Sequence, residues 1–388
     1  MRRSLLFVNT FEPVVPLYRD VFPALKDIGC QPVAMMSAIQ YRPSDVDGLT
    51  AGKTIRLWCP GIGRKHKRIP SVLYWLFAPM IILLMPKKDI VFLTQPPLFY
   101  IVGALIARAR KINYIIHIMD FYPDLLFKSR ASGNGLFSRF IQRMARLALL
   151  NADRVVVLGR CMRDLTIEKG ISPDRIVVVE NWPHRSISEN RYDGFSFRRK
   201  YALSGKFIIM YSGNMGKFHS FDSILEVARR MLPLADVAFV FIGRGVRRRE
   251  IEKAAEQCDN ILVLDHQRAE DFGEILAAGD LHFVSLREGY EGLMVPSKFY
   301  GILAAGKPVL YEGSSSGEIA RVINEESCGS VLTEGDVSGL EQAIHEYISN
   351  QSKLESEGAK SRRVYERRFD RAILIKKYVN AVSCYREA

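Results

Sequence analysis

The stretch KFIIMYSGNMG, residues 206–216, decides how the chain is organised. Its first half is an apolar run typical of a buried strand, and its second half is a loop that contains Gly213 and Gly216. Residues 183–204, just before it, are polar and contain no apolar strand run. A regular alternation of strand-like and helix-like segments therefore ends near residue 183 and begins again at 206, which predicts two domains.

Strand-like runs alternate with helix-like segments on both sides of this break. Such an alternation forms parallel sheets with right-handed crossovers. The sequence therefore predicts an α/β protein with two doubly wound, Rossmann-like domains that face a cleft. The strand-like runs are residues 4–9, 31–37, 89–97, 113–120, 153–159 and 174–182 before the break, and 206–211, 237–245, 260–265, 281–286 and 308–311 after it.

A chain of 388 residues is too long for one ordinary core. We expect an N-terminal domain over residues 1–183, a linker over 184–204 and a C-terminal domain over 205–365. The basic stretch 366–388 is predicted to be a helix that packs on the N-terminal domain.

Lysine and arginine number 55 and aspartate and glutamate 42, so the formal net charge is 55 − 42 = +13. This excess favours a phosphate-bearing ligand, an acidic membrane surface or nucleic acid as partner, although a solvated basic surface has the same composition. The six cysteines include no CxxC pair, which argues against a disulfide framework or a zinc site and favours reduced thiols in the cytosol. The apolar run after Met-Arg-Arg is short, so we expect no signal peptide.

Residues 71–86, SVLYWLFAPMIILLMP, are almost wholly apolar and have basic residues on both sides. They fit a helix buried under a parallel sheet. They fit equally a helix at a membrane interface, whose basic flanks meet anionic lipid. A membrane span is the third alternative, although the stretch is slightly short for it and Pro79 interrupts it.

Ligands of open parallel sheets bind beyond the carboxyl ends of the strands, so the loops there are candidate sites. In YSGNMGKFHS (211–220), Gly213 and Gly216 allow close approach of the backbone, and Lys217 and the next helix N-terminus attract a phosphate. A plain strand-to-helix turn has the same pattern. Arg244 lies in a second glycine loop, where the alternative is a solvated first helical turn.

The segment SLREGYEGLMVPSK (285–298) is the strongest local candidate for a phosphate site. Ser297 is predicted to cap the helix that follows, and Lys298 in its first turn is placed to reach the anion that a helix N-terminus attracts. Gly301 stands in the middle of this helix, where glycine costs about 1 kcal/mol relative to alanine.

The loop after another strand contains His117 and Asp120, in HIMDFYPD (117–124). A carboxylate there is able to accept a proton from a hydroxyl group. Asp120 as a turn former and His117 as a buried core histidine are the alternatives. The two side chains converge only if the chain turns after Ile118.

Three segments resemble one known family: TQPPLFYIVGALIARARKINYIIHIMDFYPD (94–124), YSGNMG (211–216) and VPSKFYGILAAGKPVLYEGSSSGEIARVINEESCG (295–329). With them, nearly the whole chain resembles the family 4 glycosyltransferases of the two-Rossmann-domain (GT-B) type. It is most similar to the bacterial branch that builds surface polysaccharides, such as the O-antigen and colanic-acid aminosugar transferases.

The resemblance implies retaining transfer of a sugar from a nucleotide donor to an acceptor hydroxyl, with no metal and no other cofactor. Helix N-termini and cations must then stabilise the leaving diphosphate. The donor is expected on the C-terminal domain, and the acceptor on the N-terminal domain near Asp120 and the loop Phe11–Pro16. The predicted catalytic residues are Asp120, His117 and Lys298, and the predicted nucleotide-sugar-binding residues are Gly213, Asn214, Gly216, Lys217, Arg244, Glu291, Pro296, Ser297, Lys298 and Glu318.

The chain departs from the family pattern at two places. Most members have two glutamates separated by seven residues, and these positions fall on Leu293 and Gly301 here. Glu318 matches another family glutamate, so we expect it to take over the ribose hydroxyls, and bare backbone at Gly301 to leave room for the ribose or base. The usual glycine pair of the first loop is replaced by FEPVVP (11–16).

From this resemblance we predict an enzyme that transfers an N-acetylated hexosamine or deoxy-aminosugar from a UDP-sugar. The predicted acceptor is a lipid-linked saccharide or polyprenyl phosphate, and the predicted location is the cytoplasm at the inner face of the cell membrane. A nucleotide-sugar epimerase or hydrolase on the same fold is the first alternative. A basic nucleic-acid-binding protein is the second, although the sequence contains no recognition-helix module or aromatic–basic RNA platform.

Overall fold

The computed structural model describes residues 4–8, 15–37, 53–57, 78–94, 98–128, 135–188 and 191–383. The chain divides into two compact units. Unit 1 consists of Met1–Glu180, Gly292–Met294 and Ile375–Ala388, and unit 2 consists of Asn181–Glu291 and Val295–Leu374.

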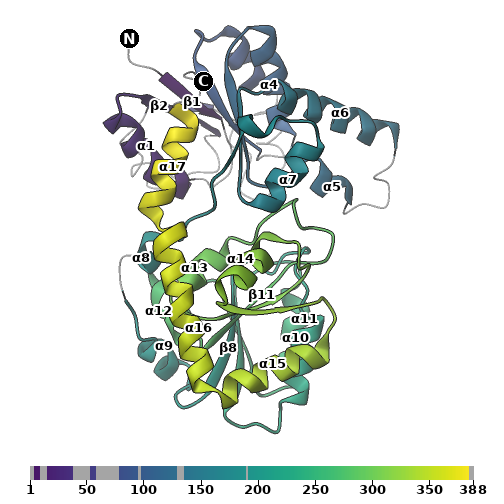
Figure 1. Cartoon of the computed structure of the whole chain (residues 1–388), viewed down its shortest axis with the longest axis vertical. Helices are drawn as coiled ribbons and strands as arrows, with labels where there is room; N and C mark the ends of the chain where they lie inside the picture. Colours follow the sequence, from purple (N-terminus) through teal and green to yellow (C-terminus); the bar gives the residue numbers. More distant parts are fainter. Residues whose placement is uncertain are drawn as a thin grey trace. The chain divides into compact units, whose positions relative to one another are not determined.

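Within the described residues, unit 1 contains a seven-stranded sheet in the order β3-β2-β1-β4-β5-β6-β7. Figure 1 labels β1 and β2 of this sheet and the helices of the unit. All neighbouring strands are parallel. The strand order reverses between β1 and β4, which is the point where doubly wound sheets bind ligands. The strands are β1 (Ser4–Val8), β2 (Gln31–Ser37), β3 (Lys53–Leu57), β4 (Asp89–Leu93), β5 (Tyr114–Ile118), β6 (Arg154–Val157) and β7 (Ile176–Val178).

Helices connect these strands, as the alternation predicts. The apolar stretch 71–86 is described from residue 78, and a helix occupies residues 78–84. It packs on α4, because a Cβ at Gly103 would lie 3.4 Å from Ile82 Cδ1. The helices of unit 1 with their own labels are α1 (Val15–Asp27), α4 (Phe99–Ala109), α5 (Asp124–Lys128), α6 (Leu136–Leu150), α7 (Arg160–Glu168) and the 3-10 turn η2 (Pro173–Arg175).

The C-terminal helix α17 (Arg371–Ser383) returns to unit 1 from residue 375 on, as the fold prediction requires. Its Tyr378 and Val382 are buried, and the Tyr378 hydroxyl lies 3.2 Å from His117 Nδ1 on β5. Lys377 pairs with Glu180 at 3.1 Å. Both ends of the chain therefore contribute to the core of the N-terminal unit.

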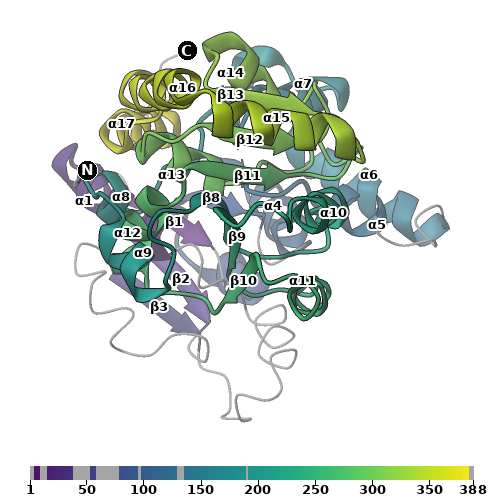
Figure 2. The ribbon, with the colours of Figure 1, turned by 90° about the horizontal axis from the view of Figure 1, so that it is seen from below.

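Unit 2 contains a six-stranded parallel sheet in the order β10-β9-β8-β11-β12-β13, which reverses between β8 and β11 (Figure 2). This is the strand order of a dinucleotide-binding Rossmann sheet. The strands are β8 (Phe207–Ser212), β9 (Val237–Ile242), β10 (Ile261–Leu264), β11 (Leu281–Ser285), β12 (Val309–Glu312) and β13 (Gly329–Leu332).

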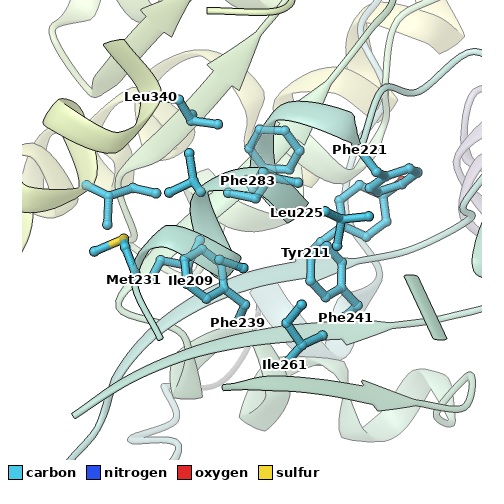
Figure 3. Close-up of a cluster of buried hydrophobic side chains, with 14 of the residues drawn as sticks. Ile209, Tyr211, Phe221, Leu225, Met231, Phe239, Phe241, Ile261, Phe283 and Leu340 are labelled. Atoms are coloured by element: carbon cyan, nitrogen blue, oxygen red, sulfur yellow. The ribbon is translucent and has the colours of Figure 1, made fainter. Parts of the chain in front are cut away.

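Helices cover both faces of this sheet, because its strands are apolar on both sides. One face packs on α10 and α15, with Phe221, Phe239 and Phe241 in the core (Figure 3). The other packs on α9 and α12. The helices of unit 2 are α8 (Arg185–Ser188), α9 (Phe195–Lys200), α10 (Asp222–Arg230), α11 (Arg248–Ala255), α12 (Phe272–Ala278), α13 (Lys298–Ala304), α14 (Glu318–Glu326), α15 (Val337–Ser349) and α16 (Gln351–Val364), with the 3-10 turn η3 (Ala269–Asp271) and the π-helical turn η4 (Tyr365–Phe369).

Three local predictions were wrong. The basic C-terminal stretch is not one helix, because η4 and the non-helical Asp370 separate α16 from α17. Ser297 makes no capping hydrogen bond, because its own backbone is already helical (φ −64°, ψ −22°). The strand-like runs omitted the edge strands β3 and β13, which are short and not continuously apolar.

Candidate active site

Two glycine loops of unit 2 meet backbone to backbone at the carboxyl ends of β8 and β9. A Cβ at Gly243 would lie 2.0 Å from the Gly213 carbonyl oxygen, and one at Gly245 would lie 2.2 Å from the Met215 carbonyl oxygen. The Met215 amide donates to the Arg244 carbonyl at 2.8 Å. Since all three glycines also have positive φ, only glycine fits here, and the paired loops form a fixed surface beside the point where the strand order reverses.

Lys298 lies directly beneath this surface. A Cβ at Gly213 would be 3.2 Å from Lys298 Cε, and Nζ lies 3.8 Å from the centre of the Tyr211 ring. Nζ donates a hydrogen bond to the Tyr211 hydroxyl, which itself donates to the Asn214 carbonyl at 2.7 Å. Tyr211 is fixed between Phe221 and Phe241 in the core, so the lysine and the loop share one rigid support (Figure 3).

Burial lowers the pKa of Lys298 well below its usual range. No carboxylate forms an ion pair with Nζ in the part of the chain that the structure describes. A partly buried amine without an anion nearby interacts strongly with a bound phosphate, because the phosphate supplies the missing countercharge.

His219 stands beside Lys298 and was not singled out from the sequence. Its Nδ1 lies 2.5 Å from the Ser285 carbonyl oxygen, and burial, together with the Lys298 charge, lowers its pKa to about 3. The ring is therefore neutral, and Nδ1 carries the proton that it donates to this carbonyl. The Ser285 hydroxyl donates to the Ser220 carbonyl at 2.7 Å, so this pair of contacts ties the loop after β8 to the end of β11.

Two predicted carboxylates lie near each other in unit 2. Glu318 is the first residue of α14 and is only 3% exposed. A Cβ at Gly317, the residue before it, would lie 3.7 Å from Glu291 Cβ. The Glu291 Oε2 atom is buried and has no hydrogen-bond partner among the described residues.

The other predicted donor residues lie around these loops. Lys217 lies 4.8 Å from the Phe218 ring, and Arg244 is exposed. Pro296 is buried and Ser297 is exposed before α13. All ten residues predicted to bind the nucleotide sugar belong to unit 2, and the structure brings Gly213, Asn214 and Lys298 into one contact network.

Helix packing explains why residue 301 is a glycine, and the sequence suggested a different explanation. A Cβ there would lie 3.3 Å from Leu276 Cδ1 and 3.5 Å from Ile187 Cδ1. Its missing side chain therefore lets α13 pack closely on α12 and α8, and does not open space for a ribose or a base.

In unit 1, His117 and Asp120 have different surroundings. His117 is 3% exposed beside Tyr378, and burial lowers its pKa to about 3. This environment agrees with the alternative interpretation of His117 as a buried core histidine. Asp120 is half-buried in the turn after β5, where its carbonyl accepts a hydrogen bond from the Thr94 hydroxyl at 2.9 Å. Residues 11–14 of the predicted acceptor loop lie outside the described residues, and Val15 and Pro16 begin α1.

Sequence comparison gives the family. Residues 19–182 match a Glycosyl transferase 4-like domain, and residues 206–350 match a Glycosyl transferases group 1 domain. The chain belongs to the family 4 glycosyltransferases. It is 28% identical to the probable glycosyltransferase WbjE of Pseudomonas aeruginosa, over 74% of this chain and 72% of that protein. It is 25% identical to the putative colanic acid biosynthesis glycosyl transferase WcaI of Escherichia coli K12, over 76% of this chain and 74% of that protein.

Solved structures show the same GT-B fold. HepE of Anabaena in complex with UDP has a TM-score of 0.73 at 12% identity, over 98% of this chain and 100% of that one. WaaG, a glycosyltransferase involved in lipopolysaccharide biosynthesis, has a TM-score of 0.71 at 14% identity, over 98% of this chain and 99% of that one.

Two further findings bear on this glycosyltransferase. Among the residues that the structure covers, no group of three or more histidine, cysteine, aspartate or glutamate side chains is placed to hold a metal ion. No helix in that part of the chain is long and apolar enough to cross a membrane.

Proposed function

We propose that this glycosyltransferase moves an N-acetylated hexosamine or deoxy-aminosugar from a UDP-sugar to a lipid-linked saccharide acceptor in the synthesis of a surface polysaccharide, with retention at the anomeric carbon. The supporting relatives are WbjE and WcaI, the second of which is named for colanic acid biosynthesis. HepE, a neighbour in fold, is crystallised with UDP and with UDP-glucose.

The partly buried Lys298 beneath Gly213 is the observation that carries the proposal. A diphosphate laid on the two glycine loops comes within reach of this ammonium group and of the exposed Arg244. These cations neutralise the charge that develops on the leaving diphosphate when the glycosidic bond breaks. Lys298 thereby provides the electrostatic stabilisation, and we propose that no metal is required.

Glu318 and Glu291 are proposed to bind the ribose hydroxyls. Carboxylates accept two hydrogen bonds from a vicinal diol, and the buried, unpartnered Glu291 Oε2 has a free acceptor position for one of them. In unit 1, Asp120 is proposed to accept the proton of the acceptor hydroxyl, because it is the carboxylate of the turn after β5 and is partly exposed. His117 is too buried to touch a substrate without rearrangement, so we assign it a positioning role through Tyr378.

We further propose that unit 1 attaches to an anionic membrane through α6. Leu136 is 85% and Phe137 is 71% exposed, which is unusual for such large apolar side chains. At 3.6 residues per turn, Leu136, Phe140 and Leu147 form one exposed stripe, and three arginines form the stripe beside it. An apolar stripe flanked by arginine is typical of a helix that lies in a lipid headgroup layer. The arginines are Arg139, Arg143 and Arg146.

The helix at 78–84 supports the same attachment. It exposes Met80, Leu83 and Leu84, and it packs on α4, which in turn packs on α6. Among the three alternatives for the stretch 71–86, these exposed apolar residues favour the membrane interface.

The transfer is tested by incubating the purified protein with UDP-sugars, with and without membrane vesicles that contain lipid-linked saccharides. We expect donor consumption only with the lipid fraction, an α-linked product from an α-linked donor, full activity in EDTA, and a rise in melting temperature with UDP. Donor turnover without lipid would instead show a hydrolase or epimerase. Absence of both donor turnover and UDP binding would overturn the proposal.

Membrane attachment is tested separately by sedimentation with phosphatidylcholine vesicles that contain about 30% phosphatidylglycerol. We expect Phe137→Ser/Phe140→Ser and Arg139→Gln/Arg143→Gln each to reduce binding at least about tenfold, because each removes one of the two attractions. Phe195→Ser is the matched control, since Phe195 is 67% exposed on α9 of unit 2. Equal loss in the control, or no loss in either double variant, excludes α6 as the contact.

A further inference from the structure

Unit 2 contains a cavity of about 440 Å³ that none of the donor residues lines. It lies between α12, the end of α13 and α16, which Figure 2 shows on one side of the sheet. Ala304, Ala305 and Gly306 form part of its wall and come just before β12, which begins at Val309. This wall is therefore near the amino end of β12, whereas the donor loops follow the carboxyl ends of their strands.

The cavity exists because its wall is built from small residues. Seven of its thirteen lining residues are glycine or alanine. α16 approaches the end of α13 at a glycine pair, where a Cβ on Gly358 would lie 2.6 Å from the Gly306 carbonyl oxygen. On the opposite wall the Tyr192 ring lies on Gly273, where a Cβ would be 2.1 Å from the ring. These contacts fix the walls, so the hollow is part of the fold.

Three arginines and one glutamate give the cavity its charge. Arg362 is held in place, because it donates to Glu366 at 2.7 Å and to the Ala304 carbonyl at 2.6 Å. Arg191 and Arg363 are exposed, and neither forms a hydrogen bond or an ion pair with another described residue. The lining therefore has an excess of two positive charges, carried by two guanidinium groups that are available to a ligand.

We propose that this cavity binds a phosphorylated small molecule of about the size of a sugar phosphate, separately from the nucleotide-sugar donor. Guanidinium groups bind phosphate oxygens in pairs, and Arg191 and Arg363 line this cavity without a partner among the described residues. The volume lies within the range of small-molecule pockets, about 300–1,000 Å³, so it accepts a ring beside the phosphate. The small side chains of α12, α13 and α16 contact that ring, and Arg191 and Arg363 bind the phosphate.

Two chain connections between the units pass along this cavity. Arg191 and Tyr192 lie in the segment that follows the end of unit 1 at Glu180, and α16 with η4 leads to the return into unit 1 at Ile375. A ligand that holds both segments to α12 and α13 restricts them at the same time, so we expect its binding to change the rate of transfer without competing with UDP.

Isothermal titration of the full-length protein with glucose 6-phosphate and with inorganic phosphate, in the presence of saturating UDP, tests the site. We expect glucose 6-phosphate to bind the UDP-saturated protein, and Arg191→Gln/Arg363→Gln to weaken it at least about tenfold, since each lost guanidinium removes a charge-assisted hydrogen bond. Ala359→Leu, at an exposed position of the wall, should weaken binding by narrowing the cavity with no change in charge.

Arg199→Gln is the control for net charge, because Arg199 is exposed on α9 and does not line the cavity; it should bind as the unaltered protein does. No binding at about 10 mM, displacement of the sugar phosphate by UDP, or equal affinity in Ala359→Leu would each overturn the proposal. Stronger binding of inorganic phosphate than of the sugar phosphate would show that the ring is not part of the ligand. UDP affinity, measured for every variant, reports separately on the donor site.

Discussion

At the residue scale, Lys298 combines two properties: it is partly buried without a carboxylate partner among the described residues, and it lies against a glycine backbone. Burial of an unpaired amine costs free energy of folding, whereas the same burial strengthens its interaction with a phosphate. The position therefore favours ligand binding at the expense of stability. Tyr211 makes this arrangement rigid, because its hydroxyl contacts both Lys298 and the Asn214 carbonyl.

Replacement of Lys298 by methionine separates these two effects. We expect Lys298→Met to weaken UDP binding about 10- to 100-fold and to lower kcat/KM for the donor by about 100-fold or more, because an ammonium group is lost from the diphosphate. The free energy of unfolding should stay the same or rise, since a buried amine is removed. Titration calorimetry, initial rates and urea unfolding give the three quantities. Lys253→Met on the exposed side of α11 is the control; unchanged UDP affinity in Lys298→Met would exclude the lysine from the donor site.

The pH dependence of UDP binding tests the same residue in the unaltered protein. Because burial lowers the pKa of Lys298 in the free protein, the bound diphosphate should raise it, and binding then takes up a proton. UDP affinity should be constant below the free-state pKa and fall as the pH rises above it. Calorimetry in buffers of different ionisation enthalpy measures the proton uptake. In Lys298→Met this uptake should disappear; if it persists, another group is responsible.

At the scale of single elements, α13 shows what sequence reasoning reached and what it missed. The start of the helix next to Ser297 follows from local chemistry, and its prediction agrees with the structure, although Ser297 makes no capping hydrogen bond. The helix ends just before Gly306, whose positive φ is typical of a glycine at a helix end. The packing role of Gly301 cannot be derived from the local sequence, because it depends on contacts with Leu276 and Ile187, which belong to other elements. The same limit explains His219: its partner Ser285 lies on another strand, and a histidine in a loop gives no signal of burial by itself.

Substitutions at Gly301 distinguish a packing role from a ligand role. Gly301→Ala should leave the free energy of unfolding unchanged or raise it by up to about 1 kcal/mol, since the helix gains propensity and the flexible ends of Leu276 and Ile187 adjust to the methyl group. Gly301→Glu should lower it by at least about 2 kcal/mol, because a carboxylate is forced against two apolar side chains. Urea unfolding measures both, and UDP titration is the second readout. Tighter UDP binding by the glutamate variant at unchanged stability would instead show that position 301 faces the donor.

At the scale of the whole molecule, the chain forms two separate cores, and a three-residue segment of the loop before α13 belongs to unit 1 while the residues on both sides of it belong to unit 2. Gly292–Met294 packs with unit 1, where the Phe121 amide donates to the Leu293 carbonyl at 2.7 Å, whereas Glu291 and Lys298 on either side belong to unit 2. Alternating strands and helices predicted the two sheets, because that pattern is local. The assignment of this short loop segment to unit 1 depends on contacts between residues far apart in sequence, so the sequence pattern does not predict it.

Hydrogen exchange measures the stability of the two units separately. UDP should slow amide exchange in unit 2 at the loops 213–215 and 243–245, where the backbone forms the proposed diphosphate surface, and should leave β5 and β6 of unit 1 unchanged. Tyr378→Phe should instead change amide exchange in unit 1 and leave the UDP site of unit 2 unchanged. It removes the partner of the buried His117 Nδ1, which costs about 1–3 kcal/mol, so exchange in β5 should accelerate while UDP affinity stays the same. Protection of β5 by UDP, or loss of UDP affinity in Tyr378→Phe, would mean that the two cores respond as one and that His117 acts on the donor as well as on the fold of its own unit.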